Sequence, residues 1–91
     1  MYKTIAEVKK ANKSIGHHWF EASTMSFFNS VIETDLLHGR FFITSERMEL
    51  DMPKQYSIRC AQEDGSISTI GKRGEFNNLT SAMVYLDKWL E

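Results

Sequence analysis

The spacing of apolar residues changes twice along the chain, from every three or four positions near the start to every second position in the middle and back again near the end. The first spacing is typical of helices that bury one side, and the second is typical of half-buried strands. Near the start, Thr4 and Glu7 fit a capping box. We therefore expect a helix over residues 4–15, ended by Gly16. Its stripe is Ile5, Val8, Ala11, Asn12 and Ile15.

The last part of the chain has the strongest helical pattern. Either Asn77 or Asn78 can cap this helix, because asparagine is favoured at helix starts. Trp89 shares its stripe with apolar neighbours, so we expect it to lie in the core or to form a hydrophobic lid. The stripe is Leu79, Ala82, Met83, Leu86, Trp89 and Leu90.

Shorter patterns fill the middle. Residues 23–29 predict a short helix, capped by Ser23 or Thr24, with Met25 and Phe28 packed inward. Residues 31–36 and 40–45, on either side of a turn at 37–39, are rich in β-branched and aromatic residues and predict a first hairpin. Residues 56–60 and 67–70 flank an Asp-Gly turn pair and predict a second hairpin.

This order predicts one α+β domain over residues 1–91, a four-stranded antiparallel sheet of two hairpins with the N- and C-terminal helices packed on one face. The chain has 91 residues, of which 42% are hydrophobic and 12% aromatic, enough for a small core. If the second face of the sheet is bare and apolar, we expect the chain to form a homodimer through it.

The segment 45–53 carries the main candidate for a contact surface. Its apolar residues alternate with acids at the period of a strand, and Pro53 marks an edge or an exit. One interpretation is an edge strand that closes the core, and the other is an exposed, adaptable, methionine-rich loop that binds a protein. The candidate residues are Glu46, Met48, Glu49, Leu50, Asp51 and Met52, joined by Trp19 and Phe20 as aromatic anchors.

Charge argues against a nucleic-acid partner. The 11 basic and 12 acidic residues give a net charge of -1, whereas duplex nucleic acid is usually bound by a concentrated positive surface. The element order is similar to that of the double-stranded RNA-binding domain, but the last helix begins without that domain's lysines. The alternative, a nucleic-acid-associated protein, would use the local clusters Lys3, Lys9, Lys10, Lys13, Lys72 and Arg73.

No motif predicts catalysis, a metal or a cofactor. The side chains of His17 and His18 diverge as neighbours, and only His38 and Cys60 remain as further natural ligands for zinc. The glycines around Lys72 lack the ending of a phosphate-binding loop. A single cysteine permits no internal disulfide, and the start of the chain has no secretion signal. We therefore expect a non-catalytic cytoplasmic protein that does not associate with membranes.

Several short stretches together resemble a known family. They are residues 11–16 (ANKSIG), 24–30 (TMSFFNS), 42–46 (FITSE), 56–59 (YSIR) and 65–70 (GSISTI). They are similar to stretches of small uncharacterised proteins carried by bacteriophages and other mobile elements. The resemblance covers nearly the full length and implies such an origin, but no functional residue.

That origin implies a function in turn. Small phage proteins without catalytic motifs often bind and occlude a host protein, as anti-CRISPR and other anti-defence proteins do. We therefore expect a non-catalytic inhibitor or adaptor that acts on a host or phage protein. If this partner normally binds nucleic acid, Glu46, Glu49 and Asp51 would imitate phosphates.

Overall fold

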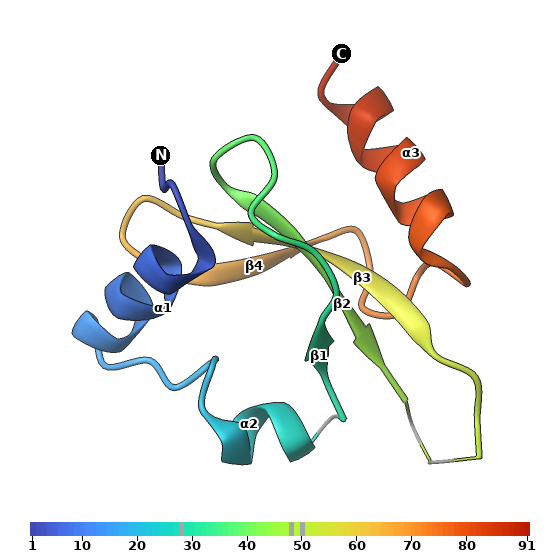
Figure 1. Cartoon of the computed structure of the whole chain (residues 1–91), viewed down its shortest axis with the longest axis horizontal. Coiled ribbons are helices and arrows are strands. Elements are labelled where there is room, and N and C mark those ends of the chain that lie inside the picture. The colour runs from blue at the N-terminus through green and yellow to red at the C-terminus, as the bar shows by residue number, and fades with distance from the viewer. Residues whose placement is uncertain (28, 48, 50) are drawn as a thin grey trace.

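The computed structural model describes residues 1–27, 29–47, 49 and 51–91. Its helices and strands form a four-stranded antiparallel sheet with a helix at each end of the chain, which confirms the α+β fold class (Figure 1). The elements are α1 (Ile5–Ser14), α2 (Ala22–Phe27), β1 (Val31–Ile32), β2 (Phe41–Glu46), β3 (Gln55–Ala61), β4 (Ile67–Ile70) and α3 (Leu79–Trp89).

Local sequence signals set the ends of α1 and the start of α3 as predicted, whereas α2 begins at Ala22, so its predicted caps Ser23 and Thr24 lie inside the helix. The Thr4 hydroxyl accepts from the backbone N–H of Glu7 at 3.2 Å, and the Glu7 carboxylate accepts from the backbone N–H of Thr4 at 3.1 Å. Gly16 follows α1 with a φ of 80°. The Asn78 side chain caps α3 by accepting from Ser81 N at 2.8 Å. In α2, Met25 is half-buried, while the predicted inward residue Phe28 lies outside the described residues.

The strands follow one another in the sheet in chain order, as two hairpins require. The second hairpin is as predicted, and Gly65 occupies its turn with a φ of 99°. The first is less regular than expected. β1 ends at Ile32, and the chain returns through a bridge between Leu37 and Phe41, so the predicted strand over 31–36 is too long. The turn needs a left-handed backbone at both His38 and Gly39.

One face of the sheet forms the main core with α3. In the ladder Phe41 pairs with Cys60 and Ile43 pairs with Ile58, so these four side chains point to the same face. Ala82 and Leu86 of α3 pack against them. Tyr56, two residues before Ile58 in the same strand, packs at the margin of this core.

The opposite face is covered by the segment that follows α1. Phe42 and Arg59 pair on this face, and Trp19 and Phe20 pack over Phe42 with ring centroids 5.6 and 5.7 Å from it. Asn12 of α1 is buried beside them and accepts from Trp19 N at 3.2 Å. Figure 1 shows α1 and α3 on opposite sides of the strands. The expectation that both helices share one face is therefore wrong, because these aromatic residues hold α1 to the other side.

The covered second face also removes the reason to expect a homodimer through it. Asn12 Nδ2 donates to the carbonyl oxygen of Gly65 at 2.9 Å and ties α1 to the turn between β3 and β4. A Cβ at Gly65 would lie 2.5 Å from the backbone carbon of Ala11. The glycine thus allows α1 to approach this turn closely.

Candidate functional site

A buried ion pair lies at the centre of the second face. Arg59 and Glu46 are each 7% exposed, and Arg59 Nη2 donates to Glu46 Oε1 at 2.5 Å. Arg59 Nε donates to Thr44 Oγ1 at 3.0 Å, and Nη1 donates to Thr69 Oγ1 at 2.6 Å. The guanidinium also lies 5.4 Å from the ring centre of Trp19. Such a charge is tolerated inside a protein because it is paired and hydrogen-bonded.

The carboxylate of Glu46 is equally well satisfied. It accepts from Thr44 Oγ1 at 2.7 Å and from Ser57 Oγ at 2.9 Å, and Ser57 Oγ in turn accepts from Gly74 N at 2.7 Å. The network therefore holds the connection between β4 and α3 against the sheet. Glu46 was predicted as an exposed contact residue, but burial and pairing with Arg59 place it inside this network instead.

The rest of the predicted contact segment connects β2 to β3. Glu49 and Asp51 are exposed, and Met52 is 45% exposed. None of the described residues between Glu46 and Gln55 lies in a strand, so these three residues belong to an exposed loop and not to an edge strand. The predicted contact residues Met48 and Leu50 lie outside the described residues. We call Glu49, Asp51 and Met52 the acidic loop.

The aromatic pair Trp19 and Phe20 anchors the connection between α1 and α2. Both side chains are half-buried, and their rings lie 4.8 Å apart in an edge arrangement. Because their rings pack on Phe42, both residues contribute to the packing of the domain itself. They are thus less available to a partner than the sequence suggested.

The outward side of α3 is the feature that the sequence analysis missed. Ala82 and Leu86 face the sheet, and Val84 lies two residues from each, about 200° around the helix. Trp89 contacts Phe41 at 5.6 Å but stays 51% exposed, so it forms the expected lid rather than core. We call the exposed apolar residues of this helix the α3 surface: Met83, Val84, Tyr85, Trp89 and Leu90.

The cations of the nucleic-acid alternative are all exposed but divide between separate parts of the surface. Lys9 and Lys13 of α1 line a shallow pocket with His17 and His18, whereas Arg73 lines a different pocket beside α2. The remaining members, also exposed, are Lys3, Lys10 and Lys72.

The histidines and the cysteine do not converge. His18 Nδ1 lies 2.9 Å from Glu21, and His38 Nε2 lies 3.9 Å from Asp87. Cys60 is buried in the core beneath α3. Among the described residues, no three histidine, cysteine, aspartate or glutamate side chains are grouped closely enough to hold a metal ion.

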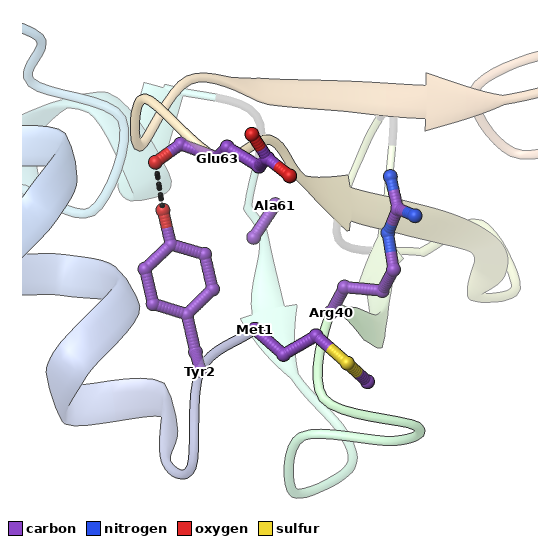
Figure 2. Close-up of a pocket in the computed structure, with 5 residues that line it drawn as sticks. All are labelled: Met1, Tyr2, Arg40, Ala61 and Glu63. Carbon is purple, nitrogen blue, oxygen red and sulfur yellow. Dashed lines mark hydrogen bonds between the residues drawn. The ribbon is translucent and has the colours of Figure 1, made fainter.

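A pocket of about 350 Å³ lies beside the N-terminal segment (Figure 2). Tyr2 forms one wall and donates its hydroxyl to the carbonyl oxygens of Gln62 and Glu63. The charged side chains of Arg40 and Glu63 line the rim and are exposed. Water competes strongly for such groups, so this pocket offers little to fix a ligand's orientation.

One carboxylate near the edge of the sheet has a shifted pKa. Ser45 Oγ donates to Glu33 Oε1 at 2.7 Å, and Lys54 Nζ lies 3.3 Å from the same oxygen. The hydrogen bond from Ser45, followed by the bond and charge of Lys54, lowers the pKa of Glu33. The ionised form is therefore favoured in the fold, and its small contribution to stability is lost as pH falls through the folded pKa.

Comparison with known proteins adds a family but no activity. In the described part of the chain, none of the helices has the length and hydropathy needed to span a bilayer. Neither curated proteins nor solved structures give a match. The model of a family of unknown function, DUF7447, matches residues 4–87 of the 91. The chain therefore belongs to this family of unknown function, DUF7447.

Proposed function

We propose that the chain is a non-catalytic protein-binding domain that docks onto a host protein through the α3 surface and acts as an inhibitor or adaptor. The observation that carries this proposal is the exposure of large apolar side chains on α3, among them Trp89 at 51% and Val84 at 49%. Aromatic residues of this kind are typical anchors of protein interfaces.

Among these residues, Val84 supports an external contact most strongly. Valine has a lower helix propensity than arginine, lysine, glutamine or glutamate, and at an exposed position it gains little compensating burial. Its side chain lies on the side of α3 that faces away from the sheet. A residue that helps neither the helix nor the core is best explained by a contact outside the domain.

The charges around the apolar surface favour a basic partner. Asp87 and Glu91 are exposed at the end of α3 against one exposed cation of this helix, Lys88. Acids at the rim of an interface speed association with a positive surface. Many positively charged proteins bind nucleic acid, which agrees with the anti-defence role that the resemblance to phage proteins suggests.

Val84→Lys tests the proposal, because it places a charge in the proposed contact and lysine is a better helix former than valine. We expect capture of the host partner by tagged protein to weaken at least about tenfold, since burial of an unpaired charge is costly. Ala6→Lys adds the same charge to an exposed position of α1, on the other side of the sheet. This variant should capture the host partner as well as the wild type does. Equal capture by both folded variants would refute the α3 surface as the interface.

A further inference from the structure

The strand β4 leaves one edge of the sheet open. In the described part of the chain, β4 is the last strand of the sheet and pairs only with β3. Its residues, Ile67–Ile70, include neither a charged residue nor a proline, which are the residues that usually protect an exposed edge from pairing. The opposite edge is much shorter, because β1 has only two residues. β4 is therefore the edge that can accept a further strand.

The ladder between β2, β3 and β4 fixes the direction of the backbone groups. Gln62 N, just after β3, donates to Ser66 O at 2.8 Å, toward β4, whereas Ala61 N donates to Arg40 O at 2.7 Å, toward β2. Alternate residues of an antiparallel strand bond to the same neighbour. The even-numbered residues of β3 therefore bond to β4, and the odd-numbered residues bond to β2.

This alternation shows which backbone groups of β4 face outward. Ser68 and Ile70 pair with even-numbered residues of β3, so their backbone groups bond inward. The alternate residues Ile67 and Thr69 thus present their N–H and C=O groups at the open edge. The side chain of Thr69 accepts from Arg59 Nη1 at 2.6 Å, which holds this part of the edge against β3.

We propose that two copies of the chain pair antiparallel through their β4 edges. With Ser68 opposite Ser68 of the second copy, Ile67 of each copy exchanges both backbone hydrogen bonds with Thr69 of the other. A pairing centred on Thr69 would require Gly71 in the ladder, but Gly71 lies outside the strand with a φ of 74°. The edge thus fits a copy of itself, as a twofold interface requires.

Charges at the two ends of β4 favour the same arrangement. The turn before β4 carries two acids, Glu63 and Asp64, and the loop after it carries two cations and one acid. Lys72 of that loop and both acids of the turn are exposed. Antiparallel pairing places the start of one β4 beside the end of the other, so each acidic turn lies near Lys72 of the second copy. Opposite charges arranged in this way fix the register of an interface.

The size of the contact sets its strength. A single added strand of this length buries far less than the roughly 1,600 Å² of a standard stable interface, so the dimer is weak and forms at high protein concentration. The pairing uses the edge of the sheet and leaves the residues of the α3 surface out of the contact. The proposed docking on a host protein and this self-association can therefore fail independently.

Exchange of backbone amide protons with water tests the pairing residue by residue. Isotope-labelled protein is compared by NMR at about 20 μM and about 1 mM, a range that spans weak self-association. The amides of Ile67 and Thr69 should exchange at least about twofold more slowly at the higher concentration, as expected once half of the chains are paired. The amides of Ser68 and Ile70 already bond to β3, so their rates should change little.

Three variants locate the contact by sedimentation velocity. Lys72→Glu sets like charges near the acidic turn of the second copy and should weaken the dimer about threefold or more. Lys10→Glu makes the same change of charge at an exposed position of α1, and its effect should be less than about twofold. Ile67→Pro removes an outward N–H at the first residue of an edge strand, where proline is tolerated, and should abolish the dimer.

The outcomes separate the second copy from other occupants of the edge. A chain that stays monomeric at about 1 mM, or a dimer in which Ile67 and Thr69 exchange at unchanged rates, would overturn the proposal. Equal effects of Lys72→Glu and Lys10→Glu would do the same. Slower exchange of these amides only after addition of a host protein would assign the edge to that protein and not to a second copy.

Discussion

Glu46→Ala should lower the free energy of unfolding by about 3–5 kcal/mol, because it leaves the buried guanidinium of Arg59 without its counter-charge. Domains of this size are stable by only about 5–15 kcal/mol, so the loss is a large share of the total. Urea denaturation followed by circular dichroism measures it. Glu49→Ala, an exposed neighbour, should stay within about 0.5 kcal/mol of the wild type.

A double variant separates the unpaired charge from a general loss of packing. Glu46→Leu combined with Arg59→Leu removes both charges, and apolar replacement of a whole buried pair is often neutral. We expect the double variant to be more stable than Glu46→Ala. A Glu46→Ala variant within about 1 kcal/mol of the wild type would show that the pair is dispensable, since that is the range of a surface pair.

Phe42→Ala should cost about 3–5 kcal/mol, the usual range for a buried phenylalanine. Phe42 is fully buried, and the rings of Trp19 and Phe20 pack on it. The variant should therefore also loosen the segment that holds α1 to the second face. In a Trp89→Phe background, tryptophan fluorescence reports Trp19 alone and should shift toward that of a solvated indole.

Met52→Ala is the matched control, because Met52 is 45% exposed and lies in the acidic loop. It should change stability by less than about 1 kcal/mol. An unchanged Trp19 signal in Phe42→Ala would contradict the assignment of this aromatic contact as the link between α1 and the sheet.

The parts of the fold that depend on neighbouring residues could be predicted from the sequence. The caps at Thr4 and Asn78 and the turn at Gly65 involve bonds or backbone angles within a few residues. The side of the sheet on which α1 packs depends on contacts between distant residues, Trp19 and Phe42. The consecutive apolar residues Phe41, Phe42 and Ile43 did carry a signal, because a strand buried on both faces loses its alternation.

The candidate site was less predictable. In the sequence, Glu46 is one of several acids in its segment. Only the pairing of β2 with β3 places the Arg59 side chain beside the Glu46 carboxylate. On α3, the apolar pattern does not reveal which members of a broad stripe the sheet can cover. Val84, off the stripe, was the available signal for an outward apolar surface.

The claim that α3 is the contact surface is tested most directly by photo-crosslinking in the host cell. A photoreactive amino acid replaces Val84 in one variant and Lys10 of α1 in another, both at exposed positions. We predict that residue 84 crosslinks to one host protein in a reproducible ratio and that residue 10 gives no such product. Crosslinks from residue 10 to nucleic acid or protein, with none from residue 84, would contradict the proposal.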